Sequence, residues 1–599
     1  MYILGISRHH DSAAALLKDG QIVALAEEER FNRQKHFDGF PTRAIQFCLN
    51  QAGIGLGDID HVAYFWQRWP EIVHGLRHFV RYAPGTFAVF KSAAGGGTPT
   101  RPKGLVATLA SDGEQRHPDD YDVGGAMLLH IKRTFTLRQT LKEALRYTGP
   151  LKFEIHLVDH HLAHAASAYV SSPFDEAAIF SVDGVGSDGT CTLLGVGRGN
   201  SIQELRRVKF PHSLGALYST VTGYLGFNPT RDEGKVMGLA PYGMDRYVGQ
   251  FKQLVRLGPD GTYELDLSWF NHHLTGKHAV SQKFLDTFGP ARQRGQAQID
   301  QHYADVAFAL QRTLEETGLH IARWLHSATG LRKICLAGGV ALNSVMNGRI
   351  LLETPFEHFF APPACSDAGT AVGAAQYVST CKLGLPRSEG DYVYLGPEFS
   401  ETEIESVLRD SGLAYHRPAD IAALAAQQIA SGRIIGWFQG RMEAGPRALG
   451  NRSILADPRD PESKSRLNEK IKHREPFRPF APSVLLERAG EYFVSDYPSP
   501  VMLLVYDVLG ERRAEVPAIT HVDGTARVQT VVRAENPEYW KVIKSFEALT
   551  GVPMLVNTSF NDNEEPIVCA PEDAIRCFRK TDLDGLAIGP FWVAKNGQP

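Results

Sequence analysis

Short apolar runs separated by polar turns predict a β-strand unit that occurs twice in this chain. An apolar run at 2–7 predicts a buried strand, and runs at 13–17 and 21–27 flank a Lys-Asp-Gly turn, which is typical of a hairpin. The same succession of strand, acidic glycine turn and hairpin recurs over 177–198. Because such units are common, chance similarity is the alternative to a true duplication.

Helical patterns follow these strand units. Apolar spacing predicts a helix over 42–51 and a long amphipathic helix over 301–328, and residues 333–337 predict a strand that ends at the pair Gly338-Gly339. A glycine pair before a helix can present backbone N–H groups to a nucleotide. Duplicated α/β lobes of this kind are the layout of actin-like ATPases and sugar kinases, so we predict that fold class.

Proline and glycine mark two breaks in the pattern. The segment 95–122 is rich in both residues, which predicts a long loop or lid. The short polar stretch Leu385–Gly390 predicts a domain boundary, with one domain at 1–385 and a second at 391–599.

Two histidines and two aspartates predict a metal site in the first domain. His160 and His164 lie four residues apart where a strand runs into an Ala-rich helix, so both imidazoles face the same side. Asp183 ends an apolar strand, and Asp367 lies at a loop-to-helix junction. Two imidazoles and two carboxylates suit a divalent transition metal. The alternative is that the two histidines only pack or cap.

Basic residues in the second domain predict an anion pocket. Arginine and lysine are interleaved with glycine and proline over 440–453 and 468–480, and the run 555–561 closes a nearby strand pattern. Planar guanidinium groups suit phosphate, and lysine supplies a point charge. Solvated surface charge is the alternative, but the flanking turn residues favour a fixed pocket.

Composition narrows the class of protein. The chain has 599 residues, 43% hydrophobic and 22% charged, as in an ordinary soluble protein of several domains. The formal net charge of -4 argues against a nucleic-acid partner. Seven scattered cysteines form no zinc or disulfide pattern, which predicts reduced thiols in the cytoplasm. We see no signal peptide and no apolar run long enough to span a membrane, so we expect no membrane partner.

Six sequence stretches carry a resemblance to a known family. They read HHLAHAASA, GKVMGLAPYG, GGVALN, GRMEAGPRALGNRS, KHREPFRPFAPS and VNTSFN, in that order. With them the chain resembles, over nearly its whole length, the O-carbamoyltransferases of nodulation-factor and antibiotic biosynthesis. The resemblance implies that the first domain is actin-like and similar to the universal tRNA threonylcarbamoyl transferase. It implies a YrdC-like α/β fold for the second domain.

The same resemblance implies a two-step activity. The second domain is expected to join carbamoyl phosphate and ATP into carbamoyl adenylate with release of pyrophosphate, and Mg²⁺ is expected with the ATP. The first domain, holding Fe²⁺ or a similar divalent metal, is expected to transfer the carbamoyl group to a hydroxyl of a specialised metabolite such as an antibiotic, toxin or glycoside. A homodimer is the default expectation for the oligomeric state.

Residue by residue, the resemblance assigns the following roles. The iron ligands would be His160, His164, Asp183 and Asp367, and His10 would be the general base on the acceptor hydroxyl, where an ordinary imidazole pKa of about 6.5 suits the task. Lys35 would contact the adenylate, and Asn343 would lie near the adenosine. Carbamoyl phosphate would bind Arg447, Arg478 and Asn557; ATP would bind Lys472, Arg527 and Ser559, with Met502 against the base.

Two other functions fit parts of the pattern. A threonylcarbamoyl-type transferase acting on tRNA would need a basic surface, which the net charge opposes. A non-catalytic nucleotide-binding regulator of actin-like fold would need neither a second basic pocket nor four metal-type ligands. We therefore favour the ATP-dependent O-carbamoyltransferase.

Overall fold

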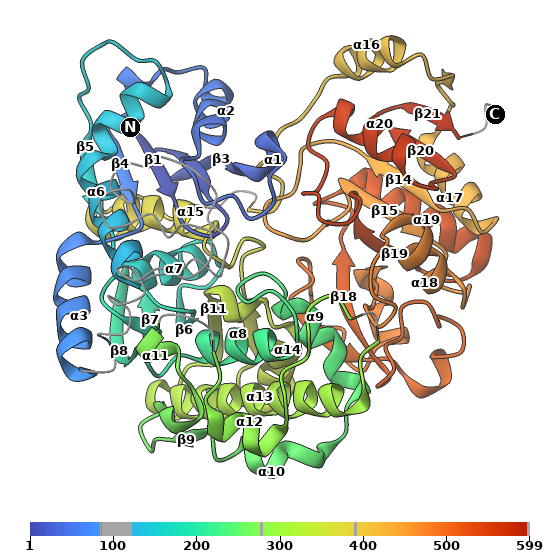
Figure 1. Cartoon of the computed structure of the whole chain (residues 1–599). Coiled ribbons are helices and arrows are strands. Elements are labelled where there is room, and N and C mark those ends of the chain that lie inside the picture. The colour runs from blue at the N-terminus through green and yellow to red at the C-terminus, as the bar shows by residue number, and fades with distance from the viewer. Residues whose placement is uncertain (84–85, 87–122, 276–278, 297, 389–391, 596–599) are drawn as a thin grey trace, which may run out of the picture. The chain divides into compact units, whose positions relative to one another are not determined.

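The chain forms two compact units (Figure 1). The structure is a computed structural model that describes all residues except 84–85, 87–122, 276–278, 297, 389–391 and 596–599. The N-terminal unit consists of Met1–Glu28 and His36–Gly390, and the C-terminal unit consists of Glu29–Lys35 and Asp391–Pro599. The sequence does not indicate that residues 29–35 belong with the C-terminal unit, and the predicted domains stay a prediction.

The N-terminal unit contains two five-stranded sheets. The first has the order β3-β2-β1-β4-β5 and consists of β1 (Tyr2–Ser7), β2 (Ala13–Lys18), β3 (Gln21–Glu27), β4 (His61–Tyr64) and β5 (Glu154–Leu157). The second has the order β12-β11-β6-β7-β8 and consists of β6 (Glu176–Val182), β7 (Thr190–Arg198), β8 (Ser201–Lys209), β11 (Lys333–Ala337) and β12 (His358–Phe360).

The two sheets share one topology. In the first, β1, β2 and β3 form an antiparallel meander, and β4 and β5 then add in parallel beside β1. In the second, β6, β7 and β8 form the same meander, and β11 and β12 add in parallel beside β6. The predicted duplication of actin-like ATPase and sugar-kinase type is thus confirmed strand by strand.

Two helices rich in small residues pack beside these sheets and lie next to the predicted metal ligands in the sequence. Helix α7 (His160–Tyr169) follows β5, and helix α15 (Gly369–Gln376) packs against α7 and β1. A Cβ atom on Gly373 of α15 would lie 1.9 Å from the carbonyl oxygen of Ala163 in α7. Only glycine permits this approach, which brings the loop before α15 close to α7.

The remaining helices of the N-terminal unit surround these elements. Long α13 and α14 pack together, and α3 packs against α6. Their bounds are α2 (Thr42–Ala52), α3 (Arg68–Arg81), α6 (Val123–Ala144), α8 (Leu214–Tyr224), α9 (Glu233–Leu239), α10 (Val248–Phe251), α11 (His272–Thr275), α12 (Gln282–Phe288), α13 (Gln301–Thr329) and α14 (Ser344–Glu353), with a small sheet of β9 (Val255–Leu257) and β10 (Tyr263–Leu265).

The C-terminal unit is built on a nine-stranded mixed sheet of order β13-β21-β20-β14-β15-β19-β16-β18-β17. Its strands are β13 (Tyr415–His416), β14 (Ile435–Phe438), β15 (Arg452–Ala456), β16 (Ala481–Leu485), β17 (Leu504–Asp507), β18 (Thr525–Val531), β19 (Met554–Ser559), β20 (Gly585–Ile588) and β21 (Phe591–Ala594). Its helices are α1 (Glu29–Asn32), α16 (Glu401–Ser411), α17 (Ile421–Ala430), α18 (Ser463–Arg466), α19 (Pro537–Thr550) and α20 (Pro571–Lys580). The C-terminal unit thus has the predicted α/β class. Its similarity to the YrdC fold stays a prediction.

Two further expectations can be placed against the structure. The segment Gly339–Leu342 is a short 3-10 turn, so α14 begins only at Ser344, later than the glycine pair suggested. The predicted loop over 95–122 lies outside the described residues. In the part of the chain that is described, none of the helices combines the length and apolar character needed to cross a bilayer.

Candidate metal and anion sites

Helix α7 places two imidazoles side by side. The Asp159 side chain caps the helix by accepting a hydrogen bond from the Leu162 amide at 2.9 Å, so the helix begins at His160. His160 and His164 are both buried, and their ring centroids lie 4.6 Å apart. The intervening His161 faces elsewhere, because its ring bonds Ser181. The i, i+4 reading of the sequence is therefore correct in geometry.

Two carboxylates meet these imidazoles. His160 Nε2 lies 3.0 Å from Asp183 Oδ2 and 3.7 Å from Asp367 Oδ1. His164 Nε2 lies 3.6 Å and 3.5 Å from the same two oxygens. One donor atom from each residue lies within 4.8 Å of all the others. The structure thus brings together all four predicted ligands from three separate parts of the sequence.

The glycine pair after β11 holds Asp183 in place. The Gly339 amide donates a hydrogen bond to Asp183 Oδ1 at 2.8 Å, which leaves Oδ2 facing the histidines. Gly338 has a φ of 98°, and a Cβ atom there would lie 2.1 Å from the Val182 carbonyl oxygen. The pair therefore orients a carboxylate. The sequence-based expectation that its N–H groups face a nucleotide does not hold for Gly339.

A histidine that sequence reasoning missed holds the second carboxylate. His9 Nδ1 lies 2.8 Å from Asp367 Oδ2, and the His9 ring stacks on Trp66 at a centroid distance of 5.5 Å. Trp66 Nε1 in turn donates to Glu71 Oε2 at 2.8 Å, and Glu71 Oε1 lies 3.0 Å from His130 Nδ1. Asp367 is thus linked, through the His9 ring and the ring of Trp66 on which it stacks, to side chains of helices α3 and α6.

The electrostatics of the four residues are those of an anionic cluster. Burial opposes charge on His164, but the adjacent carboxylates of Asp183 and Asp367 raise the pKa of that ring to about 9. Burial and the neighbouring Asp183 oppose ionisation of Asp367, yet the adjacent His164 and His9 rings hold its pKa below the ordinary value. Burial also opposes the charge on Asp183, whose pKa the two imidazoles lower strongly. Both carboxylates are therefore ionised at neutral pH.

The group fits a divalent transition metal. His164 Nε2 and Asp367 Oδ1 are buried and have no hydrogen-bond partner among the described residues. Metal–ligand bonds of about 2.0–2.2 Å place donor atoms around one ion at separations close to those found here. Two imidazole nitrogens and two carboxylate oxygens suit Fe²⁺, Zn²⁺ or a similar ion, and the donor set does not choose among them.

His10 lies in the turn between β1 and β2, beside this group. Its ring centroid is 4.6 Å from that of His9. Burial lowers the pKa of His10 to about 4, and the nearby His9 adds to the effect. The ordinary imidazole pKa assumed from sequence is thus wrong for this position. His10 is neutral over the physiological range and available as a proton acceptor, though a weaker base than expected.

Four arginine side chains of the C-terminal unit lie close to one another. Burial lowers the pKa of Arg527 well below its ordinary value, and the charges of Arg447, Arg474 and Arg478 add to that effect. Burial likewise lowers the pKa of Arg474 to about 9, with Arg478 as the next cause. Such a set of mutually repelling cations is a site that an anion would stabilise. Arg474 was not among the predicted site residues.

Lys472 extends this cationic cluster. Its buried ammonium donates to the Asn561 carbonyl at 2.9 Å and to Asn561 Oδ1 at 2.6 Å, and it also bonds Ser559. Burial lowers the pKa of Lys472 strongly, and Arg474, Arg478 and Lys35 lower it further. The structure therefore places Lys35 with the C-terminal unit, although sequence reasoning had assigned it to the N-terminal domain.

The other predicted residues of the C-terminal unit have different surroundings. The Asn557 amide group, on β19, donates to Ser483 Oγ and Gln529 Oε1 at 3.0 and 2.9 Å, whereas its buried Oδ1 has no partner among the described residues. Ser559 Oγ donates to Asn561 Oδ1. Met502 is buried with a left-handed φ of 57°, which is rare for a side chain of this type.

Asn343, whose place near the adenosine stays a prediction, makes its described hydrogen bonds within the protein. Its Oδ1 accepts a hydrogen bond from the Met346 amide at 3.0 Å and so caps α14. Its amide also exchanges two hydrogen bonds with Gln311 on α13, at 2.9 and 3.0 Å. The described contacts account for the residue as a helix cap.

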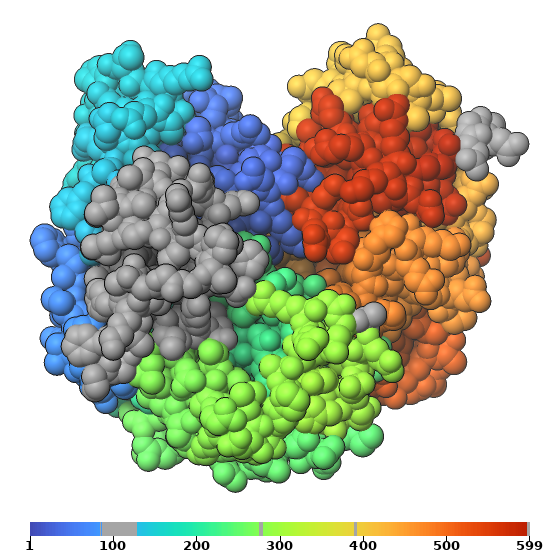
Figure 2. Space-filling model, viewed as in Figure 1, coloured from blue at the N-terminus to red at the C-terminus, as the bar shows by residue number. Residues whose placement is uncertain are grey.

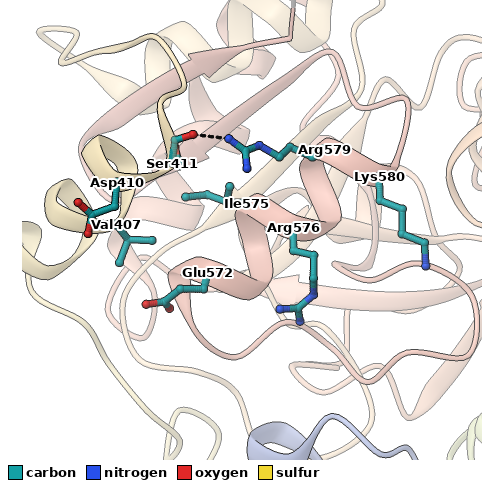
Figure 3. Close-up of a pocket in the computed structure, with 8 residues that line it drawn as sticks. All are labelled: Val407, Asp410, Ser411, Glu572, Ile575, Arg576, Arg579 and Lys580. Atoms are coloured by element: carbon teal, nitrogen blue, oxygen red, sulfur yellow. Dashed lines mark hydrogen bonds between the residues drawn. The ribbon is translucent and has the colours of Figure 1, made fainter.

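A shallow surface groove lies elsewhere on the C-terminal unit, where α16 meets α20 (gold against red in Figure 2). Arg579 reaches across it to the Ser411 carbonyl, while Arg576 and Lys580 point away from the apolar floor of Val407 and Ile575 (Figure 3). None of the predicted site residues lines this groove.

The duplicated lobes, the four metal-type ligands and the cationic cluster lead to a family of enzymes. Residues 2–376 match the family described as Carbamoyltransferase N-terminus, and residues 426–595 match the one described as Carbamoyltransferase C-terminus. The chain belongs to the carbamoyltransferase family. The resemblance stated from sequence is confirmed, and with it the class of enzyme.

Named relatives span most of the chain. Nodulation protein NolNO of Sinorhizobium fredii is 40% identical over 98% of this chain and 79% of its own length. Nodulation protein NolO of Bradyrhizobium diazoefficiens is 45% identical over 73% of this chain and 79% of its own length. Uncharacterized protein sll1178 of Synechocystis is 41% identical over 100% of this chain and 97% of its own length.

Proposed function

We propose that this carbamoyltransferase is an ATP-dependent O-carbamoyltransferase that works in two steps. The observation that carries the proposal is that each unit holds its own chemical centre: four metal-type ligands in the N-terminal unit and clustered cations in the C-terminal unit. A transferase using one centre alone would have no need of the other.

The first step is assigned to the cationic centre. Water cleaves the P–O bond of carbamoyl phosphate, phosphate leaves, and the carbamate oxygen then attacks the α-phosphorus of ATP, so that pyrophosphate departs and carbamoyl adenylate remains. Arg447 and Arg478 would bind carbamoyl phosphate, while Lys472 and Arg527 would bind ATP, which arrives with Mg²⁺. The buried Asn557 Oδ1 is suited to accept a hydrogen bond from the carbamoyl NH₂ group.

The second step is assigned to the N-terminal unit. The acceptor hydroxyl oxygen forms a bond to the carbamoyl carbon, the bond from that carbon to the AMP oxygen breaks, and the hydroxyl proton passes to His10. Burial lowers the pKa of His10 to about 4, so the ring is neutral at physiological pH and can take this proton, as a weaker base than an ordinary imidazole. A metal held by His160, His164, Asp183 and Asp367 would supply Lewis-acid stabilisation of negative charge. His9 and Gly339 fix the orientation of the two carboxylates.

The acceptor is proposed to be the hydroxyl of a specialised metabolite. The nodulation proteins among the relatives support this proposal at the level of the family.

The first experiment measures pyrophosphate release from ATP with and without carbamoyl phosphate. We expect pyrophosphate release to depend on carbamoyl phosphate and to need no acceptor. If pyrophosphate release is absent or independent of carbamoyl phosphate, the adenylate route is wrong.

Once release is established, labelled carbamoyl phosphate identifies the acceptor. A set of candidate alcohols is incubated with enzyme, ATP and ¹⁴C-carbamoyl phosphate, and the label is followed into acid-stable product. We expect transfer to a hydroxyl and AMP formation in equal amounts. Label on an amine would contradict the assignment as an O-carbamoyltransferase.

A further inference from the structure

Residues Glu29–Lys35 belong to the C-terminal unit although the sequence on both sides of them belongs to the N-terminal unit. They include helix α1 (Glu29–Asn32), in which Glu29 and Arg30 are buried. Phe31 of this helix packs on a buried apolar cluster of Met442, Ile567 and Cys569. A four-residue helix has little stability of its own, so these contacts hold it in place.

Arg30 makes the most specific contacts of this segment. Its side chain is 3% exposed, with NH1 2.9 Å from Glu29 Oε1. NH2 donates a hydrogen bond to the Gly445 carbonyl at 2.7 Å. A guanidinium is costly to bury, and the bonds that Arg30 makes to Glu29 and Gly445 offset that cost.

Gly445 lies in the loop that carries Arg447. The loop joins β14 to β15, and Gly445 has a φ of 86°. The buried Glu443 bridges the loop, because its Oε1 accepts hydrogen bonds from the Leu449 and Arg452 amides at 2.6 and 3.2 Å. Arg30 bonds the Gly445 carbonyl, two residues before Arg447. Hydrogen bonds therefore hold the backbone both before and after Arg447.

We propose that Arg30 is a positioning residue for Arg447: it holds the Gly445 carbonyl so that the Arg447 guanidinium is set for the carbamoyl phosphate anion. The proposal rests on the proposed function, because it takes Arg447 as part of the carbamoyl phosphate pocket. Its consequence is that a segment encoded near the N-terminus tunes the anion pocket of the C-terminal unit.

Removing the Arg30 guanidinium would leave the Gly445 carbonyl without its charged donor. The loop would keep the hydrogen bonds that Glu443 accepts and those that the Ala448 and Leu449 carbonyls accept. It would lose its anchor at Gly445, and Arg447 would then sample more orientations. Because a positioned guanidinium binds an oxyanion in a fixed fork geometry, the loss falls on carbamoyl phosphate binding. ATP, assigned to Lys472 and Arg527, would be affected little.

The test uses the full-length chain with Arg30→Met, Arg30→Lys and the control Arg33→Met. Arg33 lies in the same segment and donates to the Ile567 and Pro566 carbonyls at 2.7 and 2.6 Å, and none of its described hydrogen bonds goes to Gly445 or Arg447. In steady-state pyrophosphate release, we expect Arg30→Met to raise the KM for carbamoyl phosphate at least tenfold and the KM for ATP less than twofold. Arg30→Lys should give an intermediate rise, and Arg33→Met a change within twofold.

A second readout is independent of the reaction. Hydrogen exchange of the backbone amides over 447–450 should be faster in Arg30→Met than in the parent, and unchanged in Arg33→Met. A KM for carbamoyl phosphate within twofold of the parent in both Arg30 variants overturns the proposal, as does an equal rise in Arg33→Met. If the parent releases no pyrophosphate, the proposed function fails, and the exchange measurement alone decides whether Arg30 orders this loop.

Discussion

His9 Nδ1 lies 2.8 Å from Asp367 Oδ2, so a residue of the first β-turn orients a carboxylate 358 residues further along the chain. Because Oδ2 is engaged by His9, Oδ1 is the oxygen that faces His160 and His164. A side chain that hydrogen-bonds the non-coordinating atom of a metal ligand orients that ligand, and its loss commonly lowers metal affinity. His9 is therefore expected to act on the metal through Asp367.

For His9→Ala we expect metal affinity to fall by about 10–100-fold, because Asp367 becomes free to rotate. His9→Asn, whose amide can still donate to the carboxylate, should lose less. The measurement is titration of the metal-free protein with Fe²⁺ under anaerobic conditions, or with Zn²⁺. His416→Ala, on the exposed strand β13, is the control and should bind as the parent does. Equal affinity in His9→Ala and the parent would show that Asp367 needs no such support.

Metal uptake should release a proton. In the absence of metal, the two carboxylates raise the pKa of His164 to about 9, so its ring is protonated at pH 7. A metal must displace that proton, and affinity should therefore rise by up to about tenfold per pH unit between pH 6 and 9. Calorimetric titration in buffers of different ionisation enthalpy measures the number of protons released. A value near zero at pH 7 would contradict a protonated His164.

His10→Ala should slow carbamoyl transfer to the acceptor by about 10²–10⁴-fold, the usual scale for a general base. Because burial lowers the pKa of His10 to about 4, the base is unprotonated throughout the range from pH 6 to pH 8. The ratio of parent to variant rates should therefore stay constant over that range. A ratio that shrinks below pH 7 would mean that His10 has an ordinary pKa.

The buried pair Glu71 and His130 predicts a pH dependence of stability. Burial raises the pKa of Glu71 from 4.5 to about 8, so the folded protein keeps a proton that the unfolded chain releases. The free energy of unfolding should thus fall as pH rises between 4.5 and 8. Burial lowers the pKa of His130, so its own contribution is complete above about pH 6.5.

The comparison that isolates Glu71 is Glu71→Gln between pH 6.5 and 8. The parent should lose up to about 2 kcal/mol of stability over that window, and the amide variant should lose less. Denaturant unfolding at the two pH values measures both. Parallel losses in parent and variant would mean that Glu71 is already ionised at pH 6.5.

Local patterning was sufficient for most of the fold. The hairpin from Ala13 to Glu27 and the strand-to-helix junction at His160 depend on turn chemistry and side-chain periodicity within a few residues, which the sequence displays. The duplicated topology followed because both copies carry the same local signals.

The contacts that sequence reasoning missed are long-range. His9 is one residue of a polar turn until the fold brings Asp367 to it, and Arg474 is one basic residue of a basic stretch until the fold places it near Arg478 and Arg527. Helix α1 is four residues long, and nothing in its local pattern indicates that it packs in the C-terminal unit. For Gly339, the pattern located the turn correctly, but its partner is a carboxylate.

The central claim is that two centres in two units divide the reaction. Its most direct test is a reciprocal pair of variants, Arg447→Ala and His164→Ala, each assayed for carbamoyl-phosphate-dependent pyrophosphate release and for carbamoyl transfer. We expect Arg447→Ala to abolish pyrophosphate release, and His164→Ala to lose metal and transfer while retaining pyrophosphate release. Loss of pyrophosphate release in His164→Ala to the same extent as in Arg447→Ala would contradict the division of labour.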